Sequence, residues 1–210
     1  MDAKDKVKVG EFSRKGKTRI KTQALDHDFQ ADEIVTPYGL FLPEYNETYL
    51  YLVQSFASSD FMVDSLINFW KTNSYRFLKV KKLLINLDNG GENSSRRTQF
   101  MKRIVEFVDE TGIEIELVYY PPYHSKYNPV ERVWGVLEKH WNGALLNTIN
   151  TVIEYAKTMT YNNIHPVVQL VTKSYSTGVK LTKKEMNKLE ERFVRLTGLE
   201  KWFVKISVKT

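Results

Sequence analysis

Cysteine is absent from this 210-residue chain, and proline and glycine are scarce, with 6 and 10 residues. Without cysteine the protein has no disulfide, no thiolate metal site and no cysteine nucleophile, which suits a reducing compartment. Apolar runs are far shorter than the ~20 residues of a membrane span, and the first residues, Met1 to Lys6, lack the apolar core of a signal peptide. The sequence therefore predicts a soluble, cytoplasmic protein.

The residues that are abundant indicate a globular fold with a basic surface. Hydrophobic residues make up 42% of the chain and aromatic residues 13%, enough for a full core. Lysine and arginine total 31 against 25 acidic residues, which gives a net charge of +6. This excess favours an anionic partner without identifying it.

Strand and helix patterns alternate along the chain. The run Leu83–Leu87 is continuously apolar apart from Asn86, so we expect a central strand covered on both faces. The order of the elements predicts an α/β fold, a mixed sheet with helices on both faces. Strands are expected near residues 6–9, 40–42, 49–53, 83–87 and 113–118, and helices near 59–70, 95–110, 129–141, 149–159 and 182–198.

Two acids occupy positions that suit metal chemistry. Asp88 follows the strand 83–87 and precedes Asn89-Gly90-Gly91, and Glu131 lies in the first turn of the helix that begins at Pro129. Carboxylates at a strand end and at a helix start can share divalent cations, whose preferred ligands are hard oxygens. The pair predicts metal-assisted cleavage or joining of nucleic acid.

Each acid also has a purely structural interpretation. Asp88 before Asn89-Gly90 could simply favour a tight turn. Asn128 as N-cap, Pro129 at the first helical position and Glu131 at the third could form a capped helix start. If the choice of acids is wrong, Glu92 is the substitute beside Asp88 and Glu138 the substitute for Glu131.

Basic residues gather in three segments that could bind DNA. A polar run near the amino terminus suits sequence-independent contact with the DNA backbone, and a helix start favours phosphate. A solvated helix face is the alternative for Arg96 and Arg97, and simple exposure is the alternative for His124. Trp134 and Trp141 are interpreted as core residues. The candidates are Arg14, Lys15, Lys17 and Arg19, then Arg96 and Arg97, then His124 and Lys126.

Three segments together resemble a known family. Asp2-Ala3-Lys4, Asp88-Asn89-Gly90-Gly91 and the block from Tyr120 to Glu131 are similar to the three acidic signatures of DDE transposases, specifically the Rhodopirellula-type domain of bacterial insertion sequences. The resemblance covers nearly the whole chain. It implies an RNase H-like fold with a mixed five-stranded sheet, a catalytic core over residues 1–145 and a helical extension over 146–210 packed on that core.

The resemblance also implies a chemistry. Asp2, Asp88 and Glu131 would bind two Mg²⁺ or Mn²⁺ ions, water would cleave the transposon end, and the freed 3′-hydroxyl would attack target DNA. Asp26 and Asp28 are the fallbacks for Asp2. The implied partners are DNA and further copies of the chain, in the bacterial cytoplasm and, when bound to DNA, at the nucleoid.

The amino terminus departs from the family pattern. The chain begins just before Asp2, so we expect a truncated first strand and a missing helix-turn-helix region. Two alternatives therefore stay open: an RNase H-like nuclease without strand transfer, and an inactive remnant that still binds DNA.

Overall fold

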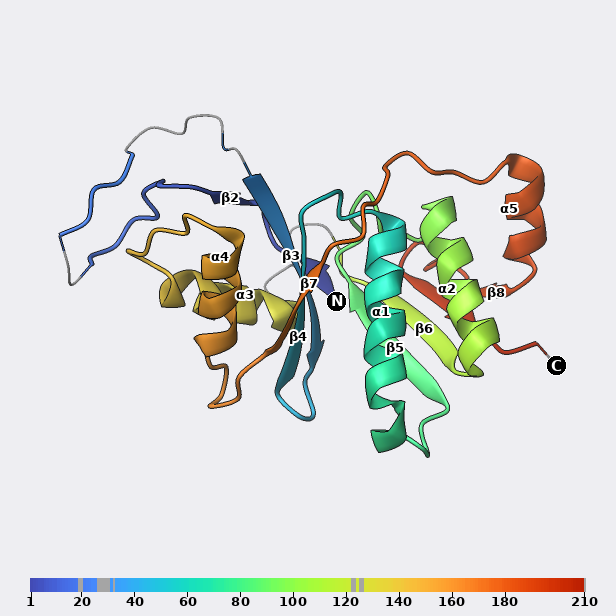
Figure 1. Ribbon diagram of the computed structural model, residues 1–210. Coiled ribbons are helices and arrows are strands. Elements are labelled where there is room, and N and C mark those ends of the chain that lie inside the picture. The colour runs from blue at the N-terminus through green and yellow to red at the C-terminus, as the bar shows by residue number, and fades with distance from the viewer. Residues whose placement is uncertain (19–20, 26–30, 32, 122–123, 125–126, 210) are drawn as a thin grey trace. The chain divides into compact units, whose positions relative to one another are not determined.

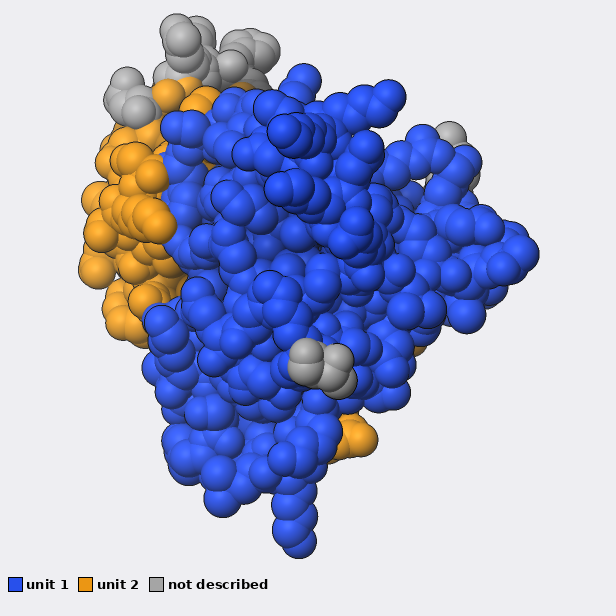
Figure 2. Space-filling view, turned by 90° about the vertical axis from the view of Figure 1, so that its right-hand side faces the viewer, with its two compact units in different colours: residues 1, 57–128, 175–210 blue, residues 2–56, 129–174 orange. Residues whose placement is uncertain are grey.

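The structure, a computed structural model, describes residues 1–18, 21–25, 31, 33–121, 124 and 127–209 (Figure 1). The chain forms two compact units (Figure 2). Unit 1 comprises residues 1, 57–128 and 175–210, and unit 2 comprises residues 2–56 and 129–174.

Unit 1 contains a four-stranded mixed sheet in the order β5-β6-β9-β8. Strands β5 (Lys82–Leu87) and β6 (Glu114–Tyr119) run parallel. Strand β9 (Phe203–Ile206) is antiparallel to β6 and to β8 (Phe193–Arg195). Burial alternates along β6, so one face of the sheet is covered and the other is more open.

Helices α1 (Ser59–Asn73) and α2 (Thr98–Thr111) pack against each other in unit 1 (Figure 1). Helix α2 ends at Gly112, whose left-handed backbone (φ 69°) closes the last turn. The short 3-10 helix η1 (Ser74–Arg76) and helix α5 (Lys183–Glu190) are the other helices described in this unit. The buried side chains of α2 recur at helical spacing and include Phe100, Met101, Ile104, Val105, Phe107 and Val108.

Unit 2 contains a five-stranded mixed sheet. Strands β1 (Asp2–Ala3) and β2 (Val7–Val9) both pair with the long strand β3 (Glu33–Leu42) in antiparallel fashion. Strand β4 (Glu47–Val53) is antiparallel to β3 and parallel to β7 (Val167–Val171).

Two helices contribute to the core of unit 2, α3 (Pro129–His140) and α4 (Ile149–Thr158). Trp134 packs so closely on β3 that a side chain at Gly39 would lie 2.7 Å from its ring. The interpretation of Trp134 and Trp141 as core residues is confirmed, since both are buried, together with Val130 and Leu137 of the first of these helices. The cluster joins them to Val7, Val9, Val35, Leu50, Leu52, Val152, Ala156 and Met159.

The mixed α/β class is confirmed, but three details of the prediction are wrong. Strand β5 lies at the end of its sheet, and Leu84 is 59% exposed, so the strand is not covered on both faces. The last helix ends at Glu190 rather than at Gly198, because Phe193–Arg195 pairs with β9 as a strand. The segment 146–210 is not simply helical, since it also supplies β7, β8 and β9.

That segment contributes to both units, residues 146–174 to unit 2 and residues 175–210 to unit 1. The division into a core and an extension at residue 145 stays a prediction. Within the described residues, none of the helices combines the length and the apolar character needed to span a bilayer.

Candidate active site

Asp88 lies directly after β5, at the start of a tight turn. Asn89 adopts a left-handed conformation (φ 62°), and the backbone N–H of Gly90 donates to Asp88 Oδ1 over 3.2 Å. The side-chain amide of Asn93 donates to the same oxygen over 2.8 Å. The turn interpretation is therefore confirmed, and the same turn fixes an exposed carboxylate at the end of the strand.

Glu92, the substitute acid beside Asp88, is bonded to Ser59 and Arg97. Its carboxylate accepts hydrogen bonds from the backbone N–H and the hydroxyl of Ser59, at 3.1 and 3.0 Å, and thereby caps helix α1. Arg97 pairs with both carboxylate oxygens of Glu92 at 3.0 and 3.1 Å. The neighbouring acid is thus engaged with a helix end and a guanidinium, and Asp88 is the better candidate ligand.

Asp2 is buried in unit 2, with 4% of its surface exposed. It lies on β1 opposite Gly39 of β3, and its Oδ2 accepts a hydrogen bond from the indole N–H of Trp134 over 3.2 Å. Trp134 lies on α3, the helix that carries Glu131 in its first turn. The strand acid and the helix acid of unit 2 therefore belong to elements that one buried tryptophan connects.

The start of α3 is not capped as the sequence suggested. The side chain of Asn128 is buried, and within the described part of the chain neither of its amide atoms has a hydrogen-bond partner. An N-cap side chain must accept from a backbone N–H of the first turn. The predicted Asn128 cap is therefore wrong, and Glu131 is exposed in the first turn of the helix.

Glu138, the substitute for Glu131, is engaged with basic and aromatic side chains of unit 2. It forms an ion pair with Lys4, lies 3.6 Å from Arg14 and accepts a hydrogen bond from the indole N–H of Trp141 over 2.9 Å. Burial raises its pKa, but the hydrogen bonds from Lys4 and Trp141 and the two positive charges outweigh burial and hold the pKa below its ordinary value. This carboxylate belongs to the packing of unit 2.

The three predicted acids are divided between the units, with Asp88 in unit 1 and Asp2 and Glu131 in unit 2. In the described part of the chain, no three histidine, cysteine, aspartate or glutamate side chains form a group that could hold a metal ion. The fallback acids Asp26 and Asp28 lie outside the described residues.

The basic residues of the amino-terminal run differ in their surroundings. Arg14 stacks over the ring of Trp141 at 5.0 Å, and its side chain is only 17% exposed, so it is part of the packing around Glu138. Lys15 and Lys17 are exposed. Arg19 lies outside the described residues. Among the described candidates of this run, the two lysines are the ones that face solvent.

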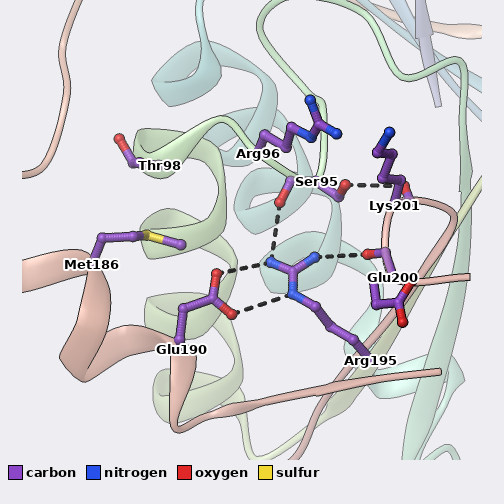
Figure 3. Close-up of a pocket in the computed structure, with 8 residues that line it drawn as sticks. All are labelled: Ser95, Arg96, Thr98, Met186, Glu190, Arg195, Glu200 and Lys201. Carbon is purple, nitrogen blue, oxygen red and sulfur yellow. Dashed lines mark hydrogen bonds and ion pairs between the residues drawn. The ribbon is translucent and has the colours of Figure 1, made fainter. Parts of the chain in front are cut away.

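The two arginines before α2 also differ. Arg97 pairs with Glu92, whereas Arg96 is exposed and lines a pocket of about 410 Å³ (Figure 3). The other lining residues are Ser95, Thr98, Met186, Glu190, Arg195, Glu200 and Lys201.

Arg195 links three segments around this pocket through hydrogen bonds to Glu190, Ser95 and Glu200. It pairs with both carboxylate oxygens of Glu190 and donates to the backbone carbonyls of Ser95 and Glu200. The side chains of Arg96 and Lys201 extend away from it (Figure 3). The pocket thus combines an arginine that is bonded to Glu190 and to two backbone carbonyls with two exposed cations.

His124 is exposed, and its ring stacks on that of Tyr127 at a centroid distance of 5.8 Å. Lys126 lies outside the described residues. Of the two predicted basic residues that precede Glu131, the structure describes His124, whose side chain is exposed.

Comparison with known proteins identifies a family for this chain. The family model described as "Rhodopirellula transposase DDE domain" matches residues 1–208, essentially the whole chain. No curated protein and no solved structure gave a significant match.

Proposed function

Because the chain belongs to the family of Rhodopirellula-type transposase DDE domains, we propose that it cleaves DNA at transposon ends and joins the freed 3′-hydroxyl to target DNA. The observation that carries the proposal is the family match over residues 1–208, and the local placement of three acids supports it. Asp2 lies on the first strand, Asp88 follows a strand, and Glu131 opens a helix.

Asp2, Asp88 and Glu131 would hold two Mg²⁺ or Mn²⁺ ions. The donor set fits these ions, since all three side chains offer hard carboxylate oxygens. Asp88 Oδ2 accepts no hydrogen bond from a described residue, and the competing acids Glu92 and Glu138 are engaged elsewhere. When bound, the ions would activate the attacking oxygen and stabilise the leaving oxygen.

The protein's own residues set the positions of these carboxylates. The Gly90 N–H and the Asn93 amide hold Asp88 at the end of β5, and the Trp134 indole holds Asp2. Fixed donors of this kind keep a carboxylate in one orientation before substrate arrives, which reduces reorganisation during the reaction.

Exposed basic side chains would bind the DNA backbone. The described candidates include Lys15 and Lys17 in unit 2, and Arg96, His124 and Lys201 in unit 1. Contacts of this kind are independent of sequence and weaken steeply with salt. Pairing two transposon ends would require a homo-oligomer, and a DNA substrate places the protein at the bacterial nucleoid.

The test is Mn²⁺-dependent cleavage of a labelled duplex that carries the terminal repeats flanking the gene. We expect Asp88→Ala and Glu131→Ala to lower cleavage at least 100-fold, because each removes a charged metal ligand. Glu110→Ala and Glu44→Ala, which remove exposed glutamates from units 1 and 2, are the matched controls.

Three results would overturn the proposal. Undiminished cleavage by Asp88→Ala or Glu131→Ala would remove the acids from the reaction. Cleavage without any joining would favour an RNase H-like nuclease. DNA binding without cleavage or Mn²⁺ binding would favour an inactive remnant.

A further inference from the structure

Asn93 is a buried polar side chain beside Asp88, with 3% of its surface exposed. Its Nδ2 donates to Asp88 Oδ1 over 2.8 Å, whereas its Oδ1 is buried and has no hydrogen-bond partner among the residues that the structure describes. Buried side-chain oxygens are nearly always paired, because desolvation is costly when no donor replaces water. The unpaired oxygen therefore indicates a missing partner.

The orientation of this amide follows from chemistry. An ionised carboxylate only accepts hydrogen bonds, and an asparagine amide has its two donors on Nδ2. Exchanging the two amide atoms would set the Asn93 carbonyl against Asp88 Oδ1 at 2.8 Å, with no proton between two acceptors. The carbonyl of Asn93 is thus the amide atom directed away from Asp88 Oδ1.

Three oxygens surround one point beside Gly90. A Cβ built at this position would lie 3.2 Å from Asp88 Oδ2, 3.3 Å from Asn93 Oδ1 and 3.4 Å from Asp88 Oδ1. Because residue 90 is glycine, no side chain fills this space. Two carboxylate oxygens and one amide oxygen, all hard donors, border a volume that a small cation could enter.

The loop that carries Asn93 is fixed by its neighbour. The Glu92 carboxylate caps α1 at Ser59 and pairs with Arg97, and the Ser59 hydroxyl donates back to the Glu92 carbonyl over 2.6 Å. The residue before Asn93 is therefore anchored to two helix starts, which holds the amide in place without help from Asp88.

We propose that Asn93 is a positioning residue for Asp88 and a neutral oxygen ligand of the cation that Asp88 binds. Its amide N–H fixes the rotation of the carboxylate, and its carbonyl completes a three-oxygen face over Gly90. This inference rests on the proposed function, because it assumes that Asp88 binds a divalent cation. It adds Asn93, an uncharged side chain, to the three acids as a ligand of the cation.

The experiment measures Mn²⁺ binding to the full chain by calorimetry and by the Mn²⁺-induced shift of the thermal midpoint. We expect Asn93→Ala to weaken Mn²⁺ binding at Asp88 about 10-fold, as loss of a supporting partner typically does. Asn73→Ala is the matched control, since Asn73 is also buried in unit 1 and donates to a backbone carbonyl, Phe69 O, over 2.9 Å.

Asn93→Asp separates a cation ligand from a merely structural residue. This variant keeps the oxygen facing Gly90 but removes the donor to Asp88 and sets two carboxylates side by side. We expect a lower thermal midpoint without metal and a larger Mn²⁺-induced rise than in the unmodified chain, because the cation relieves the repulsion. A structural role alone would lower the midpoint with no gain in the Mn²⁺ response.

The outcomes separate this inference from the proposed function. If Asp88→Ala loses Mn²⁺ binding while Asn93→Ala and Asn93→Asp respond to Mn²⁺ like the unmodified chain, the role of Asn93 is wrong and the function stands. If Asp88→Ala itself binds Mn²⁺ normally, the proposed function fails first. If Asn93→Ala does not fold, as shown by circular dichroism, the isosteric Asn93→Asp decides the question.

Discussion

The indole N–H of Trp134 donates to Asp2 Oδ2 over 3.2 Å, across 132 positions of the sequence. This bond links β1, where Asp2 is buried, to α3, the helix that begins with the exposed Glu131. Trp134 therefore has two roles in unit 2: its ring packs against Gly39 on β3, and its N–H holds a carboxylate.

Trp134→Phe should lower the rate of DNA cleavage while costing only a moderate part of the free energy of unfolding. The phenyl ring keeps most of the packing but removes the donor to Asp2, and a lost hydrogen bond to a charged group costs about 1.5–3 kcal/mol. We expect a stability loss within that range by urea unfolding and a fall in cleavage of at least 10-fold. Trp70→Phe, at a buried tryptophan of unit 1, is the control. Equal cleavage by both variants would show that the Trp134 bond has no part in catalysis.

Gly39→Ala and Gly135→Ala should change stability in opposite directions. A Cβ at Gly39 would lie 2.7 Å from the Trp134 ring, so overpacking should destabilise the protein by about 1–3 kcal/mol. A Cβ at Gly135 on α3 meets no atom of the described residues within 4 Å, and alanine in a helix interior is favoured over glycine by about 0.5–1 kcal/mol. The free energy of unfolding of each variant checks this, and a stable Gly39→Ala protein would contradict the packing of Trp134 on β3.

Glu138→Gln should remove a pH-dependent part of the stability. The pKa of Glu138 is lowered in the folded state, because its hydrogen bonds and nearby cations outweigh burial. Its contribution is therefore present above the unfolded pKa of 4.5 and is lost as pH falls through the lower folded pKa. Near neutral pH the thermal midpoint of the unmodified chain should be higher than that of Glu138→Gln. This difference should shrink as the pH falls below 4.5. Glu44→Gln, at an exposed residue, should show no such trend.

Arg96→Ala should weaken DNA binding, whereas Arg97→Ala should mainly lower thermal stability. Arg96 is exposed, so its loss should weaken DNA binding and reduce the slope of log K against log[salt] by about 1. Arg97 is paired with Glu92, so its loss should mainly lower the thermal midpoint. Titration of a fluorescent duplex at several salt concentrations, with thermal unfolding of both variants, makes the comparison. Equal slopes for Arg96→Ala and the unmodified chain would remove Arg96 from the DNA surface.

The local placement of the acids could be predicted because it depends on short-range patterns. Asp88 follows an apolar run and begins a turn, and Glu131 follows a proline at a helix start. Their supports could not be predicted, since they join distant segments. The Glu92 cap on α1 spans 33 positions and the Trp134 bond to Asp2 spans 132. No periodicity in one segment carries information about such partners.

The carboxyl-terminal strands were missed for a different reason. Met186, Leu189 and Phe193 have helical spacing, but Phe193 and Val194 also suit a strand, and pairing with β9 decides the outcome. Strand β7 is five residues long and is selected by parallel pairing with β4. Tertiary pairing of this kind overrides local preference in short segments.

The most direct test of the central claim is strand transfer from a duplex whose 3′-hydroxyl end is already exposed, into a supercoiled target plasmid with Mn²⁺. Using a pre-cleaved end isolates the joining step from cleavage. The account predicts joined products with the unmodified chain and with Glu110→Ala, and none with Asp88→Ala or Glu131→Ala. Joined products with either acid removed would contradict the claim that these carboxylates carry the reaction.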